Sequence, residues 1–228
     1  MNYPVSLTWR VTFCLRLALF VMLLPAGFDL SAQSRPFEKE VEDLIARDSA
    51  INKNKIILFT GSSSVRFWKD VASYFPEYNV LNRGFGGSTM KDLLYYTDKL
   101  IIPYQPRMIF IYEGDNDLAG KRKPEEIIAE ADSILLLIRS KVSKKVPVLF
   151  ISAKPSLARW NMKDEYLAFN QQLKDWTATK KRVKYVDVWT PMLDARGEVQ
   201  NDLFINDGLH MNKKGYDIWG RVIKPYIR

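Results

Sequence analysis

The stretch Lys55–Ser64, KIILFTGSSS, constrains the fold of this chain more than any other segment. Residues 56–59 form a short continuous apolar run, which is typical of a parallel strand covered on both faces. Gly61 and three serines end the run, and residues 65–75 then repeat apolar side chains at helical spacing. A turn from a strand into a helix lies at the carboxyl edge of a parallel sheet, where open α/β sheets bind ligands. The stretch therefore predicts an α/β fold with a serine at its ligand-binding edge.

Four further short apolar runs follow this strand and alternate with helical patterns. The predicted strands are 80–81, 108–112, 146–151 and 183–188. An amphipathic helix is predicted over 36–51, and a second over 89–100 begins with a capping box at Thr89. A long helix starts at Pro124, and the next one carries Leu167, Leu173 and Trp176. Asn212 caps the last predicted helix. Residues 113–123 are expected to form a loop. The alternation predicts one three-layer α/β/α domain with a five-stranded parallel, doubly wound, flavodoxin-like sheet.

The first 32 residues have the pattern of a secretory signal peptide. Arg10 and Arg16 accompany the apolar run 17–24, and small and polar residues then lead to Ala32. The run is too short for an ordinary transmembrane span. We expect cleavage near Ala32, a mature domain over residues 33–228 with no stable membrane span, and export to the periplasm or the medium. An uncleaved anchor is the alternative.

Charge and cysteine usage exclude several classes of function. The formal net charge is +8, but the lysines and arginines are scattered, which indicates a solvated basic surface. We expect no nucleic-acid binding from an exported chain that contains no recognisable nucleic-acid module. The single cysteine, Cys14, lies within the predicted leader, so thiol catalysis and cysteine-ligated zinc are excluded for the mature chain.

The serines of the first turn and the segment Asp207–His210 are candidates for one catalytic site. Serines at the start of a helix usually cap it, and a phosphate-binding loop of the flavodoxin type is a further alternative. His210 is the only histidine in the chain. Asp207, three residues earlier in a turn, can reach the imidazole Nδ1, which leaves Nε2 able to take a proton from a serine. The plain alternative for this pair is a helix-start aspartate beside a surface histidine.

The second predicted strand is followed by a glycine-rich segment, residues 82–87, NRGFGG. A plain turn would explain it. A functional interpretation is a backbone N–H, exposed by the missing side chain, that points at a developing oxyanion. A dinucleotide fingerprint is excluded, because its third glycine would fall at Thr89.

The third predicted strand is followed by Gly114-Asp115-Asn116-Asp117. A two-metal site is disfavoured, because such sites need several histidines. Asn116 could instead offer its amide to the same oxyanion. Glu113 and Asp115 could tune contacts to a leaving group, although acidic residues that solubilise a loop are the favoured interpretation.

Three of these motifs follow the first three strands in order, and the fourth precedes the last helix. In this order the chain resembles the SGNH, or GDSL-like, hydrolases from about Lys55 to its end. The resemblance implies an SGNH hydrolase fold and a catalytic triad of Ser63, Asp207 and His210. It also implies three oxyanion donors, namely the N–H groups of Ser63 and Gly87 and the side chain of Asn116.

The chain departs from the family pattern next to the nucleophile. The family's aspartate before the serine is Ser62 here, and its following leucine is Ser64. Ser62 and Ser64 therefore stay as alternatives to Ser63, and Gly84 or Gly86 as alternatives to Gly87.

The activity that the resemblance implies is ester hydrolysis through an acyl-enzyme, with no cofactor and no metal. The expected substrate is a small molecule or polysaccharide that carries a small acyl group, most simply an acetylated carbohydrate. Arg159 and Trp160 follow the fourth strand and could rim the site, although Trp160 could equally be packing. The alternatives are a lipid esterase or lysophospholipase, a thioesterase, or a non-catalytic binder of flavin or carbohydrate at the same edge.

Overall fold

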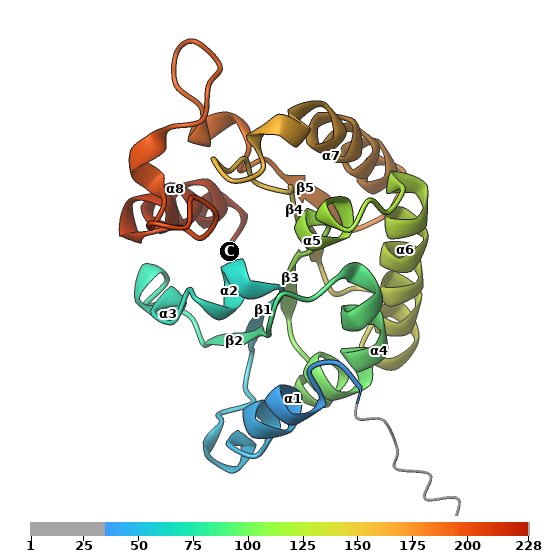
Figure 1. Ribbon diagram of the computed structural model, residues 1–228. Coiled ribbons are helices and arrows are strands. Elements are labelled where there is room, and N and C mark those ends of the chain that lie inside the picture. Colours follow the sequence, from blue (N-terminus) through green and yellow to red (C-terminus); the bar gives the residue numbers. More distant parts are fainter. Residues whose placement is uncertain (1–34, 228) are drawn as a thin grey trace, which may run out of the picture. The chain divides into compact units, whose positions relative to one another are not determined.

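A parallel sheet of five strands organises the residues that the computed structural model describes, 35–227 (Figure 1). The strands lie in the order β2-β1-β3-β4-β5. Their bounds are β1 Ile57–Gly61, β2 Val80–Gly84, β3 Met108–Tyr112, β4 Val148–Ile151 and β5 Val183–Val186. The predicted five-stranded parallel sheet is confirmed. The predicted leader, residues 1–32, lies outside the described part of the chain.

Helices cover both faces of this sheet. They are α1 Glu38–Ile45, α2 Ser63–Arg66, α3 Val71–Tyr74, α4 Met90–Leu100, α5 Asp115–Ala119, α6 Pro124–Lys141, α7 Lys163–Ala178 and α8 Lys213–Ile223. Figure 1 shows α4, α6 and α7 on one side of the sheet and α2, α3 and α8 on the other. Within residues 35–227 no helix is long and apolar enough to span a membrane.

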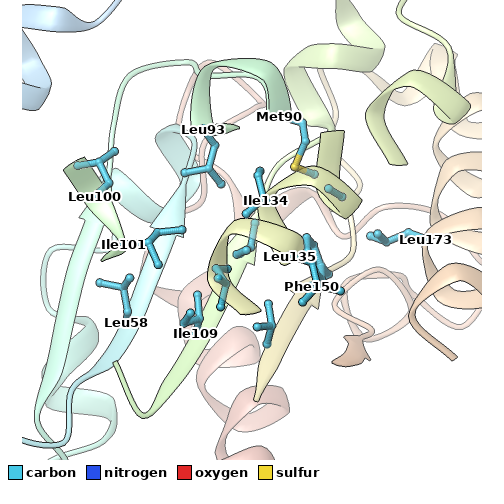
Figure 2. Packing of buried hydrophobic residues seen from close by; sticks show 14 of the residues in the cluster. Leu58, Met90, Leu93, Leu100, Ile101, Ile109, Ile134, Leu135, Phe150 and Leu173 are labelled. Carbon is cyan, nitrogen blue, oxygen red and sulfur yellow. The ribbon is translucent and has the colours of Figure 1, made fainter. Parts of the chain in front are cut away.

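The alternation of side chains along each strand builds two cores. Leu58, Ile109 and Phe150 point to the side of α4 and α6, where Leu93 and Ile134 meet them (Figure 2). The intervening strand residues, such as Phe59 and Phe110, pack on the other face against Trp68 and Trp219. Because both of their faces are buried, the central strands β1, β3 and β4 are almost entirely apolar, whereas the edge strands β2 and β5 carry Asn82, Arg83 and Lys184.

The caps at two helix starts are confirmed. The N–H of Asp92 donates to Thr89 Oγ1, while the N–H of Thr89 donates back to the Asp92 carboxylate at 2.9 Å. The Asn212 side chain accepts the N–H groups of Lys214 and Gly215, and so begins α8.

Several predicted elements differ from the structure. Residues 36–51 divide into α1 and a 3-10 turn, Asp48–Ala50, because the Asp48 carboxylate is bound by Arg83 and Tyr104. Residues 113–123 are not entirely a loop, since α5 forms there. β4 and β5 are shorter than predicted: Pro147, which has no N–H for the ladder, precedes β4, and Asp187, which accepts the N–H of Trp189, follows β5. β2 is longer than predicted, since it continues to Gly84.

The helical pattern over residues 65–75 is also interrupted. It gives two short helices, α2 and α3, instead of one. The Asn82 side chain donates to the carbonyls of Val65 and Trp68, at 2.7 and 3.0 Å. The same two carbonyls accept the N–H groups three residues ahead, from Trp68 at 3.0 Å and Val71 at 3.2 Å, and not those four residues ahead that an α-helix would supply. The break leaves Phe67 at the end of α2, beside the site described next.

Candidate active site

The first strand delivers Ser63 to the carboxyl edge of the sheet. Gly61 ends β1 with φ of 124°, and a Cβ there would lie 1.9 Å from the carbonyl oxygen of Tyr112. Only glycine fits this close approach. The N–H of Ser62 then donates to the same carbonyl at 3.0 Å, and α2 begins at Ser63. Ser62 and Ser64 are buried, at 1% and 2% exposure, while Ser63 is partly exposed.

Ser63, His210 and Asp207 form one chain of hydrogen bonds. His210 Nε2 lies 2.9 Å from Ser63 Oγ, and His210 Nδ1 lies 2.6 Å from Asp207 Oδ2. With the ring proton on Nδ1, donated to Asp207, Nε2 is an acceptor for the serine hydroxyl. The structure therefore brings together the three residues predicted from segments 147 positions apart.

The turn that carries His210 is held by Asp207 itself. Asp207 Oδ1 accepts the N–H groups of Leu209 and His210, at 2.8 and 2.9 Å. Partial burial raises the pKa of Asp207, but its hydrogen bonds with the His210 ring and these two N–H groups outweigh that effect and lower the pKa to about 2. Asp207 is therefore negatively charged at neutral pH, as a partner for an imidazolium must be.

An aromatic side chain that the sequence analysis missed contacts His210. The Phe67 ring meets the imidazole edge to face, with centroids 4.8 Å apart, and 42% of Phe67 is exposed. A helical pattern unbroken through residues 65–75 places Phe67 on an unremarkable helix surface. Phe67 is the C-cap of α2, one turn after Ser63 and still with helical backbone, and this position places it beside the histidine.

The N–H groups of the glycine-rich segment have different partners. Gly84 donates to the Asn82 side chain at 2.8 Å, and Gly86 donates to Glu40 at 3.0 Å. For the N–H of Gly87, residues 35–227 offer no acceptor within hydrogen-bond distance. The same holds for Ser63 across that range. Of the three glycines, Gly87 is thus the one whose N–H can serve a ligand.

Asn116, in the first turn of α5, lies next to Gly87. Its Nδ2 is 3.8 Å from the point where a Gly87 Cβ would be. Nδ2 donates to the Ser88 carbonyl at 2.9 Å, and Oδ1 accepts from Arg159 at 3.0 Å. The amide has two N–H bonds, so one remains for a ligand. Gly87 and Asn116 thus offer two N–H donors next to each other, and convergence of the Ser63 N–H on the same oxygen stays a prediction.

Glu113 and Asp115 are buried, with exposures of 1% and 4%, so the interpretation as solubilising residues is wrong. Asp115 accepts hydrogen bonds from Tyr112 and Tyr166 and forms ion pairs with Lys154 and Arg159. Burial raises its pKa, but the two cations and the tyrosine hydroxyls lower it to about 2. The sequence carried no signal for this carboxylate, because the burial of its partner Lys154 is visible only in the fold.

The two predicted rim residues lie in the loop between β4 and α7. The Arg159 guanidinium contacts Asp115 and Asn116. The Trp160 ring stacks on Trp189, with centroids 5.8 Å apart, and its Nε1 donates to Glu198. A role of either in binding substrate stays a prediction. Across residues 35–227, no cluster of three or more histidine, cysteine or acidic side chains could hold a metal ion.

A parallel α/β sheet that gathers a serine, a histidine and an aspartate at its carboxyl edge is the architecture of an SGNH-type hydrolase. The sequence model of the GDSL-like Lipase/Acylhydrolase family matches residues 55–218. The chain belongs to this family of ester-hydrolysing enzymes, and the predicted resemblance is confirmed.

Solved structures share the fold. A Streptococcus pneumonia protein described as a platelet activating factor is 21% identical with a TM-score of 0.75, over 84% of this chain and 92% of that one. A GDSL-like lipase from Bacteroides thetaiotaomicron is 21% identical with a TM-score of 0.68, over 84% and 97%. A catalytic mutant of an acetylxylan esterase from Geobacillus stearothermophilus is 17% identical with a TM-score of 0.63, over 77% and 94%. A search of curated proteins gave no match to the chain.

Proposed function

We propose that this protein is a serine esterase that hydrolyses carboxylic esters through an acyl-enzyme on Ser63. The observation that carries the proposal is the chain of hydrogen bonds from Asp207 through His210 to Ser63 Oγ, at 2.6 and 2.9 Å. A serine hydroxyl becomes a useful nucleophile when a positioned base can take its proton. His210 is that base, and Asp207 holds its tautomer and stabilises the imidazolium.

The reaction has two steps. Ser63 Oγ attacks the ester carbonyl while His210 removes the hydroxyl proton, and His210 then protonates the departing alkoxide. In the second step, water attacks the acyl-enzyme with His210 again as base, which releases the acid and regenerates Ser63. Both tetrahedral intermediates carry an oxyanion, which the N–H groups of Ser63 and Gly87 and the Asn116 amide stabilise. Loss of one such donor typically costs about 3 kcal/mol in the barrier. The chain supplies every group that the reaction needs, so the proposal includes no cofactor.

For the substrate, we propose a small acyl group, most simply acetate, on a carbohydrate. The fold is shared with an acetylxylan esterase, which supports this choice. Arg159 and Trp160 lie in the loop beside the site, and a sugar could stack on the Trp160 indole if it displaced Lys163, whose Nζ lies 4.7 Å from the centre of that ring.

A lipid-type ester is the second candidate, and a specific observation favours it. Phe67 lies against His210, and Leu157, 39% exposed, lies beside Gly208 of the histidine turn. Exposed apolar side chains at the catalytic histidine suit an acyl chain or an apolar leaving group.

The first experiment measures hydrolysis of p-nitrophenyl esters from acetate to octanoate by the mature chain and by Ser63→Ala. Ser64→Ala is the matched control, because Ser64 is the buried neighbour in the same helix. We expect Ser63→Ala to abolish turnover and Ser64→Ala to retain it. Unchanged turnover in Ser63→Ala would refute the proposal. Selectivity for acetate supports the carbohydrate deacetylase, while best turnover of octanoate supports the lipid-type esterase.

We also propose that the chain is exported as a mature domain of residues 33–228. The basic residues and the short apolar run of the N-terminus support this proposal. N-terminal sequencing of the protein from the periplasm or medium of an expressing bacterium tests it. A mature protein that starts at Gln33 is the expected result, and retention of Met1 in the membrane fraction contradicts it.

A further inference from the structure

The Asn116 amide is held in one orientation by two different neighbours. The Ser88 carbonyl requires a donor and lies 2.9 Å from Nδ2, while Arg159 requires an acceptor and lies 3.0 Å from Oδ1. If the amide were flipped, Oδ1 would face the Ser88 carbonyl and Nδ2 would face the Arg159 guanidinium, so both hydrogen bonds would be lost. Arg159 thereby keeps a hydrogen-bond donor, and not a carbonyl oxygen, on the side of Gly87.

The guanidinium is itself fixed by Asp115. Arg159 Nη1 donates to the Asp115 carboxylate and to its backbone carbonyl, the latter at 2.9 Å. The Tyr112 and Tyr166 hydroxyls hold the same carboxylate from two further sides. Only 18% of the Arg159 side chain is exposed, so this pair is shielded from water and geometrically constrained.

The Asp115 carboxylate also contacts Lys154, which holds the turn that carries His210. Lys154 Nζ lies 3.5 Å from Asp115 Oδ2 and donates to the carbonyl of Leu209, at 2.8 Å, one residue before His210. Asp115 thus connects the segment that carries Asn116 with the segment that carries His210. Lys154 acts on backbone, whereas Arg159 touches the proposed oxyanion donor directly.

We propose that Arg159, held by Asp115, is a positioning residue that sets the Asn116 amide with its N–H toward the oxyanion. The inference rests on the proposed function, because it gives Asn116 a role in the esterase reaction. It assigns to Arg159 an effect on kcat, exerted entirely through Asn116.

A double-mutant cycle with Arg159→Met and Asn116→Ala tests this proposal. Methionine keeps an unbranched apolar stem and removes all donors, and Asp115 keeps Lys154 and both tyrosines as partners. With p-nitrophenyl acetate, we expect Asn116→Ala to lower kcat by about 100-fold and Arg159→Met by about 10-fold or more, with little change in KM. In the Asn116→Ala background, Arg159→Met should lower kcat by less than about threefold, because its target is already gone. Arg159→Lys should fall between wild type and Arg159→Met, because a point cation cannot hold Asp115 and Asn116 together.

Arg122 provides the matched control. It pairs with Asp117, the next carboxylate of α5 after Asp115, and with Glu130, and 25% of its side chain is exposed. Within the described residues it makes no hydrogen bond to Asn116. We expect Arg122→Met to lower the melting temperature while kcat stays within about twofold of wild type, since only the support of α5 is weakened.

Each outcome of the cycle decides the proposal. Equal losses from Arg159→Met in both backgrounds, or a loss no larger than that of Arg122→Met, would overturn it while leaving the esterase function intact. Unchanged kcat in Asn116→Ala would remove Asn116 from the oxyanion site and overturn it too, while Ser63→Ala tests the nucleophile separately. If the wild type does not turn over the acetate ester, the same cycle is measured on the rate at which a fluorophosphonate labels Ser63, and the same ratios apply.

Discussion

Glu113 and Asp115 follow the end of β3, two residues apart, and both are buried. Their pKa values are nevertheless shifted in opposite directions. Asp115 has two cations and two tyrosine hydroxyls around it, and its pKa is lowered to about 2 although burial alone would raise it. Burial raises the pKa of Glu113 well above its usual range, with the Ser88 hydroxyl as its one stabilising neighbour and the charges of Asp117 and Asp92 adding to the rise. Partners, and not depth, decide the charge of a buried carboxylate.

The hydrogen bonds around Glu113 agree with a neutral acid. The Ser88 hydroxyl lies 2.7 Å from Glu113 Oε1 and 3.2 Å from the Phe85 carbonyl, and it has one proton for the two. A protonated Glu113 that donates to Ser88 leaves the Ser88 proton for Phe85. A neutral contact thus supports the loop of Gly87, whereas an ionic one supports the first turn of α5, which carries Asn116, and the turn of His210.

Asp115→Asn breaks the ionic side and should have the largest effect. It leaves Lys154 and Arg159 in the interior without their counter-ion, and loss of one partner of a buried pair typically costs about 3 to 5 kcal/mol in unfolding free energy. Because the folded pKa of Asp115 is lowered, its contribution is complete above the unfolded pKa of about 3.9 and is lost as pH falls toward 2. Urea unfolding at pH 7 and pH 3 checks both statements. A loss under about 1 kcal/mol at pH 7 would contradict the first.

Glu113→Gln tests the neutral side and should have a smaller effect of opposite sign. The folded pKa of Glu113 is raised, so the wild type loses stability as pH rises above the unfolded pKa of about 4.3. Glutamine has the same shape and cannot ionise. The unfolding free energy of the variant should therefore rise relative to that of the wild type by about 1.4 kcal/mol per pH unit, until Glu113 ionises in the folded wild type. Urea unfolding from pH 4 to pH 6 measures the difference, which reaches about 2 kcal/mol at pH 6 on this slope, and a difference independent of pH would contradict a neutral Glu113.

Glu40→Gln extends the comparison to a partly exposed carboxylate and should have the smallest effect. Glu40 pairs with Arg66 at 2.8 Å, with 27% and 46% of the two side chains exposed, and it accepts the N–H of Gly86. Glutamine keeps an acceptor for Gly86 and loses only the charge, so we expect a loss under about 1 kcal/mol. Addition of 0.5 M salt should remove most of the difference in thermal unfolding, because surface pairs are screened.

The five strands and the position of the site could be predicted because both follow from local patterns. Apolar runs such as 108–112 mark buried strands, and parallel strands bring their carboxyl ends to one edge, so motifs after the first three strands must converge there. The split of residues 65–75 could not be predicted, because the interruption comes from a side chain, Asn82, on the next strand.

The ionic support of Asn116 was also beyond the sequence pattern. Its members lie after β3, after β4 and in α7, and each is an ordinary charged or aromatic residue in its own segment. Acidic residues in a predicted loop are usually solvated, and only the folded loops show that Lys154 and Arg159 enclose Asp115. Pairings of this kind depend on side-chain contacts between distant segments, which no local periodicity reports.

The arrangement of N–H groups at the serine turn has a consequence for hydrogen exchange. The amides of Ser62 and Phe85 donate to the carbonyls of Tyr112 and Gly61 and so belong to the sheet, where exchange requires a large opening. Gly87, which has no acceptor in the described part of the chain, can exchange its proton without any unfolding. Slowly exchanging amides therefore border the ligand-binding edge. The Gly87 amide, proposed to bind the oxyanion, should exchange quickly until an adduct on Ser63 supplies an oxygen that accepts its N–H.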